Sequence, residues 1–469
     1  MIGLISEFHC PYPGPSLKMA QAASGVAAYP FTRGATVSRN AVGQVTSKKD
    51  PMRDPSAAVN PDADRSLFGR RSYLLYVSGR FFGTLANTSQ AVIIAWEVYE
   101  TARRTMSVAE AAFAVGMIGL VQFLPLFALT LFAGEAADRY NRRLILAVCY
   151  VAHLLISVGL AFHSEFWGSL WPIFALSALF GSARAFFQPT ASALAPMLVP
   201  LNLLPRAIAT SSLTTQLASI IGPAVGGLLC AASPAIGYAV CGGLYAAAAI
   251  CTLLIRANTQ PPFEHGRSRA EQIREGLVYV WGNKLVLGAI SLDLFAVLLG
   301  GATGLLPVYA RDVLNVGSEG FGILRSSPAI GALLMAGYLA TRPIRSRIGV
   351  KMFVAVGLFG LMTLVFAYSR SFPLSIFALA MLGAADMVSV FTRQSLVQIA
   401  TPDRMRGRVS AVSTLFIGAS NELGEFESGV VARFLGPVGA VAFGGAGSLL
   451  VTGVWAWLFP SLRKADRLT

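Results

Sequence analysis

The sequence predicts an all-α membrane protein with 12 transmembrane helices in two parallel-repeat six-helix bundles and with both termini cytoplasmic. The 469-residue chain is 55% hydrophobic and 13% charged, about half the roughly 25% of charged residues in a soluble domain. Runs without a charged side chain recur at spanning length, and basic residues concentrate on one side of the predicted spans. This composition excludes a soluble protein and, for most of the chain, a disordered one.

Charge-free runs that could cross a hydrocarbon core of roughly 30 Å identify the first spans. Residues 111–133, 144–162 and 166–183 each supply one, and the 49 charge-free residues of 207–255 supply two, with a turn at Ser233-Pro234. Charges interrupt the other candidates only once or a few times. Spanning strands would need polar and apolar alternation, which these runs lack. The other candidates are 73–98, 286–308, 320–340, 352–369, 373–392, 408–431 and 437–459.

The distribution of basic residues predicts the orientation. With the N-terminus inside, 24 of the 37 Lys and Arg residues fall in the inner loops and ends, and 5 fall in the outer loops. Arg184 and Arg393 are among the inner set, whereas Arg80 and Arg325 fall inside helices. This imbalance places both termini on the cytoplasmic side. The formal net charge of +14 is therefore mainly a sign of topology, and nucleic acid is not expected as a partner.

Five segments follow from these patterns. We predict a disordered cytoplasmic tail at 1–70, a six-helix bundle at 71–256, a cytoplasmic central loop at 257–284, a second six-helix bundle at 285–460 and a cytoplasmic tail at 461–469. The first segment is rich in Pro, Ser, Ala and Gly and lacks the basic-then-apolar order of a signal peptide. Within the central loop, Arg269–Trp281 places Ile273, Leu277, Val278 and Trp281 on one face of a predicted helix on the inner membrane surface.

The two halves also repeat each other. Parallel halves related by an axis along the membrane normal are one arrangement of secondary transporters, with the solute path between them. Ordinary use of Gly and Pro in packed helices is the alternative explanation of these matches. Gly119, Pro125, Gly134, Arg139 and Arg142 recur 203 positions later as Gly322, Pro328, Gly337, Arg342 and Arg345, and Gly181, Pro200 and Arg206 recur 202 positions later as Gly383, Pro402 and Arg408.

The inner loop between the second and third predicted helices contains Gly134, Asp138, Arg139, Arg142 and Arg143. Glycine permits close backbone approach, and the aspartate can pair with a guanidinium or interact with a helix N-terminus. The motif resembles motif A of the major facilitator superfamily. The resemblance implies an inner latch that steadies the outward-open state and breaks during alternating access. Asn141 replaces the usual glycine of the motif, and Thr341 replaces the aspartate in the second half.

The fifth predicted helix contains Gly222, Pro223, Gly226 and Gly227, with Ala218 where a first glycine is usual. Proline kinks a helix, and glycines permit close packing on a neighbour. The stretch resembles the fifth-helix motif of exporters and antiporters in that superfamily, although Gly/Pro-rich helices are common in membranes. The span 66–467 also resembles the bacterial siderophore- and macrolide-efflux-like secretion permeases, through LVQFLPLFALTLFAGEAADRYNRR, SLDLFAVLLGGATGLLPVYARDVL, TPDRMRGRVSAV and SNELGEFESG.

Charged residues inside the membrane are costly and are candidates for function. Arg80, Asp293, Asp386, Glu422 and Glu425 lie inside the predicted helices. We predict that this set contains proton-coupling or substrate-binding groups, since an exporter driven by protons needs a carboxylate that exchanges a proton with either side. The alternative is a structural ion pair, for instance of Asp293 or Asp386 with Arg80, Arg184 or Arg325.

These features predict a secondary active transporter of the bacterial inner membrane that works by alternating access. We expect a monomeric, proton-coupled exporter of a small amphipathic compound, of drug or siderophore type, in contact with membrane lipids. Neither an enzyme nor a cofactor is expected, and the cysteines lack metal-ligand spacing. The absence of a Gly-Lys pair argues against nucleotide binding. An importer or lipid flippase of the same fold, or a non-transporting receptor or scaffold, remains the alternative.

Overall fold

The structure, a computed structural model, describes residues 67–465 except 167, 201, 258, 261–268, 343 and 345. Regular secondary structure in these residues is helical, without a strand. The tail predicted at 1–70 therefore lies outside the described residues up to residue 66, and so do 466–469 of the C-terminal tail.

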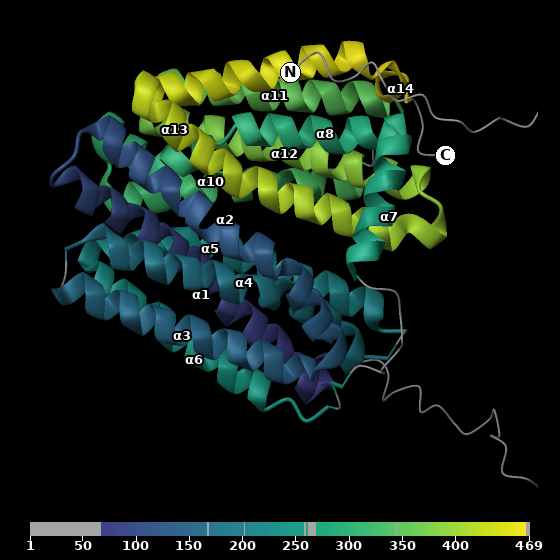
Figure 1. The fold of residues 1–469 in the computed structure, drawn as a ribbon, viewed down its shortest axis with the longest axis horizontal. Helices are drawn as coiled ribbons and strands as arrows, with labels where there is room; N and C mark the ends of the chain where they lie inside the picture. The colour runs from purple at the N-terminus through teal and green to yellow at the C-terminus, as the bar shows by residue number, and fades with distance from the viewer. Residues whose placement is uncertain are drawn as a thin grey trace, which may run out of the picture. The chain divides into compact units, whose positions relative to one another are not determined.

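The first half of the chain forms six long helices, drawn from purple to teal in Figure 1. The sequence sets some of their ends locally. Ser107 caps the second helix by accepting a hydrogen bond from the Glu110 amide over 3.3 Å, while Glu110 accepts one from the Ser107 amide over 3.0 Å. The fifth helix ends at Ala232 and the sixth begins at Pro234, which confirms the predicted turn. The six helices are α1 Arg71–Arg103, α2 Val108–Arg139, α3 Arg142–Phe166, α4 Leu170–Leu198, α5 Leu204–Ala232 and α6 Pro234–Leu253.

The second half continues from a shorter helix, α7, which spans Arg269–Gly282. The next long helix stops at Leu299, and three short turns follow it. The remaining helices reach residue 463 and are drawn from green to yellow in Figure 1. These elements are α8 Lys284–Leu299, η2 Ala302–Leu305, α9 Leu306–Val308, η3 Tyr309–Val313, α10 Gly317–Thr341, α11 Ile348–Tyr368, α12 Phe372–Ala400, α13 Asp403–Leu458 and α14 Pro460–Arg463.

Ten helical segments in the described residues are long and apolar enough to cross a membrane. The 33-residue helix α1 is not one of the ten. The 56-residue α13 is interrupted at Gly436, whose φ of 72° is left-handed and is followed by Pro437. Large apolar side chains are exposed on the helices, among them Trp171 (82%) and Trp457 (78%). In water such surfaces would be costly, so they indicate a lipid environment.

Two predicted spans were too short. α4 continues to Leu198 and α12 to Ala400, so Arg184 and Arg393 lie inside helices and not in inner loops. The prediction ended each span at its arginine because an unpaired charge would be costly in a membrane. Arg184 is instead paired with Glu422, and Arg393 with Asp293. This pairing allows the two helices to continue.

The four apolar residues of α7 do not share one environment. Ile273 and Leu277 pack against the cluster that includes Val409 and Val412 of α13. Val278 and Trp281 are 68% and 72% exposed. The predicted single apolar face is therefore divided, with one part on the protein and the other part exposed.

Equivalent helix pairs pack in the same way in the two halves. In the first, α4 crosses α2 closely at Gly181, where an added Cβ would meet the backbone of Gln122. In the second, α12 crosses α10 at Gly383, where an added Cβ would meet the backbone of Pro328. These glycines are the members of the sequence repeat that lie 202 positions apart. The two halves meet where α2 packs on α13 and α5 packs on α10.

Candidate functional site

Two ion pairs join charged residues inside the helices to α13. Arg184 of α4 donates to Glu422 of α13 over 3.0 Å and to the side-chain oxygen of Gln122 over 3.0 Å. One turn further along α13, Glu425 accepts from Arg325 of α10 over 2.9 Å. Arg325 also donates to the Thr303 carbonyl over 2.8 Å. The first ion pair links the two halves of the chain, whereas the second lies within the second half.

A third ion pair is more deeply buried. Arg393 of α12 lies 3.2 Å from Asp293 of α8, with side-chain exposures of 2% and 8%. Arg393 also donates to Ser413 over 3.1 Å. The structural ion pair expected as the alternative role of Asp293 is present, but the partner is Arg393 and not Arg80, Arg184 or Arg325. Arg393 lies in α12 beyond the predicted end of its span, within reach of Asp293.

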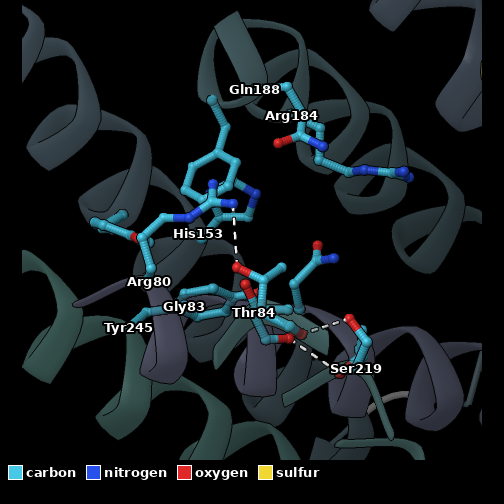
Figure 2. A pocket seen from close by; sticks show the side chains of 13 residues that line it. Arg80, Gly83, Thr84, His153, Arg184, Gln188, Ser219 and Tyr245 are labelled. Atoms are coloured by element: carbon cyan, nitrogen blue, oxygen red, sulfur yellow. Dashed lines mark hydrogen bonds between the residues drawn. The ribbon is translucent and has the colours of Figure 1, made fainter. Parts of the chain in front are cut away.

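The first half contains a cavity of about 190 Å³. Figure 2 shows the side chain of Arg80 among the lining residues. The side chain of Arg184 extends away from that of Arg80. The guanidinium of Arg80 donates to Thr215 over 3.3 Å and lies 5.6 Å from the centre of the Phe187 ring. The lining contains arginines, hydroxyls, amides and aromatic rings but no carboxylate. It consists of Arg80, Gly83, Thr84, Asn87, Thr88, Tyr150, His153, Arg184, Phe187, Gln188, Thr215, Ser219 and Tyr245.

The buried histidine on the wall of this cavity is held by a backbone group. Nδ1 of His153 lies 2.6 Å from the Cys149 carbonyl, and its ring stacks on Tyr245 with centroids 5.1 Å apart. A carbonyl can only accept, so Nδ1 carries the proton in this hydrogen bond. His153 is therefore a buried histidine whose ring nitrogen is bonded to a neighbouring backbone carbonyl.

The second half contains a cavity of about 250 Å³ with the opposite charge. Asp386 of α12 lies on its wall together with Asn421 and Thr303. In the part of the chain that the structure describes, Asp386 makes no ion pair within 4.0 Å. Asp386 and Arg184 are 202 positions apart, the spacing that relates Gly383 to Gly181. Equivalent helices of the two halves thus carry a carboxylate in one cavity and a guanidinium in the other.

The halves are in contact at the end of the helices where α1 ends and α2 begins, here called the α1–α2 end. Asp312 of η3 accepts from Tyr99 and lies 3.5 Å from Arg103, both near the end of α1. Nearby, Arg311 pairs with Glu100 over 3.1 Å. Trp96 and Phe321 stack with centroids 6.0 Å apart. Charged and aromatic groups therefore close the space between the halves at this end.

Glycines allow α2 and α13 to approach closely. A Cβ added at Gly116 would lie 2.6 Å from Cα of Gly429, well inside van der Waals contact. One turn along, a Cβ at Gly119 would meet the carbonyl of Glu422. The contact between the two halves therefore depends on residues without side chains.

The glycines of α5 face two different helices. Gly222 and Gly226 pack against α1, and Ser89 of α1 donates to the Gly222 carbonyl over 2.7 Å. Gly227 packs against Ser318 and Gly322 of α10, and Gly322 packs against the Pro223 carbonyl. The motif predicted from the fifth helix therefore lies at a contact between the two halves.

The motif that resembles motif A joins the ends of several helices of the first half. Arg142 donates to the carbonyls of Ala137 and Ala193, each over 3.0 Å, and lies 3.8 Å from Asp138. Arg143 donates to the carbonyl of Ile255, just after α6. Gly134 is buried in α2, whereas Arg139 is exposed and pairs with Glu135 over 3.0 Å. The latch role of these residues stays a prediction.

Sequence reasoning missed most of the first-half cavity. On α1, Thr84 lies four positions beyond Arg80, and Asn87 and Thr88 lie three and four positions beyond Thr84. Gln188 lies four beyond Arg184 on α4, and Ser219 four beyond Thr215 on α5, so each group occupies one helix face. This spacing could have identified them, although the same pattern is common among polar residues that pack between helices. The missed residues are Thr84, Asn87 and Thr88 on α1, Gln188 on α4, and Thr215 and Ser219 on α5.

Comparisons with known proteins agree with this architecture. The chain is 28% identical over 344 residues to an enterobactin exporter, EntS, of Escherichia coli O81 (strain ED1a). The match covers 71% of this chain and 80% of that protein. The EntS protein of Shigella boydii serotype 18 (strain CDC 3083-94 / BS512) gives the same identity and coverage.

Solved transporter structures share the fold at low sequence identity. The POT family transporter PepTSo aligns with a TM-score of 0.69 at 14% identity, over 85% of this chain and 99% of that one. The nucleoside transporter NupG aligns with a TM-score of 0.61 at 13% identity, over 83% and 99%. Proteins of this kind are transporters and not enzymes. The sequence profile of the Major Facilitator Superfamily matches residues 76–424, so this multi-pass membrane protein belongs to that superfamily.

Proposed function

We propose that the chain is a proton-coupled exporter that moves a small amphipathic compound, of drug or siderophore type, across the bacterial inner membrane by alternating access. Membership of the superfamily supports the transport class. The enterobactin exporters among the relatives favour export over import. The proton gradient is the proposed energy source.

The proposed topology has 12 spans and cytoplasmic termini. The ten apolar segments become 12 when α1 is added and α13 is divided at Gly436. With the termini inside, the α1–α2 end of the helices faces outward and the motif around Asp138 faces the cytoplasm. The contacts of Asp312 and of Gly116 would then close the outer end, as in a state that loads substrate from the cytoplasm.

The observation that carries the coupling proposal is the ion pair between Arg184 and Glu422, because it joins the two halves inside the helices. Alternating access requires the halves to move relative to each other, and such motion would separate this pair. A carboxylate left without its arginine in a low-dielectric surrounding favours its protonated form. Separation of the pair would thus link the transport cycle to proton uptake at Glu422.

Reconstitution tests the function directly. The purified chain would be placed in liposomes and assayed with radiolabelled amphipathic compounds under an imposed pH gradient. For the molecules with their cytoplasmic side outward, we expect uptake driven by an acidic interior and abolished by a protonophore. Uptake driven only by the opposite gradient would indicate an importer, and movement of labelled phospholipid alone would indicate a flippase. Binding without any movement would favour the receptor alternative.

A further inference from the structure

The first-half cavity has a charge that the proposed function leaves unexplained. Its lining contains Arg80 and Arg184 but no carboxylate. Arg184 is already neutralised by Glu422. Arg80 has no such partner, because no carboxylate lies within 4.0 Å of its guanidinium in the described part of the chain.

Three other arginines that lie inside the helices do have a carboxylate partner, unlike Arg80. Arg184, Arg325 and Arg393 each pair with a carboxylate within 3.2 Å. A charge within a membrane is costly unless it is paired or faces water. Arg80 lies nine residues beyond Arg71 on α1, roughly 14 Å along the helix axis. Arg80 therefore places a positive charge at the wall of the cavity that no described carboxylate neutralises.

The surroundings of Arg80 favour an anion over a cation. Among the described residues, Nε of Arg80 has no hydrogen-bond partner, and the 3.3 Å contact of its guanidinium with Thr215 is long for a charged donor. The side-chain amides of Asn87 and Gln188 line the same cavity and can donate. The hydroxyl of Ser219 donates to the Thr215 carbonyl over 2.9 Å and is already engaged. Guanidinium and amide donors together match a carboxylate, phenolate or sulfonate.

The apolar part of the wall indicates what the anion is attached to. The rings of Tyr150, Phe187 and Tyr245 line the cavity beside Arg80. The volume of about 190 Å³ is below the roughly 300–1,000 Å³ of pockets that enclose a drug-sized ligand. The cavity therefore fits one end of such a compound, an acidic group with its adjoining ring. The carboxylate of Asp386, which makes no ion pair in the described residues, would disfavour the same group in the cavity of the second half.

We propose that this cavity is a subsite for the acidic aromatic end of the transported compound, with Arg80 as the residue that contacts the anion. The compound is then an amphipathic organic anion. This inference rests on the proposed function for its physiological meaning, since it names the substrate class of the exporter. Binding itself can be measured without transport.

The test uses three probes with one body and different charge: 1-naphthoate, the neutral 1-naphthamide and the cationic 1-naphthylmethylammonium. Binding to the purified full chain in lipid nanodiscs would be measured by calorimetry. We expect 1-naphthoate to bind about tenfold or more tightly than the other two, because only the anion can receive the charged hydrogen bonds of Arg80. Equal affinity for the three probes, or no measurable preference for the anion, would overturn the proposal.

Substitutions assign the preference to Arg80. Arg80→Gln should remove it, and Arg80→Lys should keep part of it, because lysine retains the charge but lacks the planar fork. Arg406→Gln, at an exposed arginine paired with Asp403 at the start of α13, is the matched control and should bind like the parent chain. Thermal unfolding of each variant establishes that it is folded. An anion preference that persists in folded Arg80→Gln would contradict the subsite.

The outcome separates the subsite from the proposed function. Anion binding that depends on Arg80, in a chain that shows no proton-driven transport, would keep the subsite and reject the exporter. Proton-driven efflux of neutral compounds that is unchanged in Arg80→Gln would keep the exporter and reject the subsite.

Discussion

Arg184 of α4 and Glu422 of α13 form an ion pair of 3.0 Å that joins the two halves of the chain through the interior of the helices. The guanidinium also donates to Gln122 of α2, so groups on α2 and α13 both hold the Arg184 charge. Motion of one half against the other must break or stretch this contact. The pair is therefore the first target for mutation.

The substitution Glu422→Gln keeps the shape of the side chain and removes its titration. We expect net efflux driven by a pH gradient to be lost, while exchange of labelled for unlabelled substrate continues, because exchange needs no net proton movement. Both would be measured in liposomes. Asp403→Asn, at a carboxylate that is 88% exposed, is the control and should change neither rate. Normal net efflux in Glu422→Gln would exclude this carboxylate as the coupling group.

Asp293 and Arg393 give a prediction about stability. Asp293→Asn would leave the buried Arg393 guanidinium without its counter-charge, and such a loss costs about 3–5 kcal/mol of unfolding free energy. Asp386→Asn removes a carboxylate with no ion pair in the described residues and should cost less, because no arginine loses a direct partner. Denaturant unfolding in nanodiscs would compare the two variants. Equal losses would show that the Asp293–Arg393 pair has no special role in stability.

The sequence predicted the helices better than their ends. Spans were recognisable because each needs a long apolar run, but α4 and α12 continue past the charges at which the runs stop. The charge of Arg184 is compensated by Glu422, 238 positions away. Local sequence contains no sign of such a partner, since pairing depends on which helices pack together.

The candidate residues were found from sequence, but not their arrangement. The rule that charges inside a membrane are functional candidates identified Arg80, Asp293, Asp386, Glu422 and Glu425. It could not show that Arg80 lines one cavity and Asp386 another. That separation follows from the helix packing, which places each residue on a particular face of its helix.

Gly116 and Gly429 give a prediction about conformation. A valine at Gly116 would collide with the α13 backbone at Gly429, and overpacking of this kind costs about 1–3 kcal/mol. Only the state in which α2 and α13 are in contact at Gly116 is destabilised. Gly116→Val should therefore shift the population toward a state that is open at the α1–α2 end. Each 1.4 kcal/mol would change the ratio of states about tenfold.

Labelling of an introduced cysteine measures that shift. Ser318, 7% exposed beside Gly227, would be replaced by cysteine in a chain whose native cysteines are changed to serine. A thiol reagent should modify it faster when Gly116→Val is present. Gly243→Val, on α6 with nothing within 4 Å of its added Cβ, is the control and should leave the rate unchanged. A similar rate in all three chains would show that the glycine contact does not set the conformational balance.

The motif around Asp138 contains two arginines with different roles in the structure. Arg142 satisfies the carbonyls of Ala137 and Ala193 and is 17% exposed, whereas Arg139 is 57% exposed and pairs with Glu135. Arg142→Gln leaves those carbonyls without their charged donor, and each lost contact of this type costs roughly 1–3 kcal/mol. Arg139→Gln removes an exposed pair, with a median worth of about 0–1 kcal/mol.

We therefore expect Arg142→Gln to lower the thermal unfolding midpoint clearly and Arg139→Gln to leave it almost unchanged. Transport separates this structural role from the predicted latch. If Arg139 acts in the latch, Arg139→Gln should slow efflux in liposomes while its unfolding midpoint and its probe binding stay like those of the parent chain. If Arg139→Gln instead transports at the rate of the parent chain, Arg139 has no role in the latch.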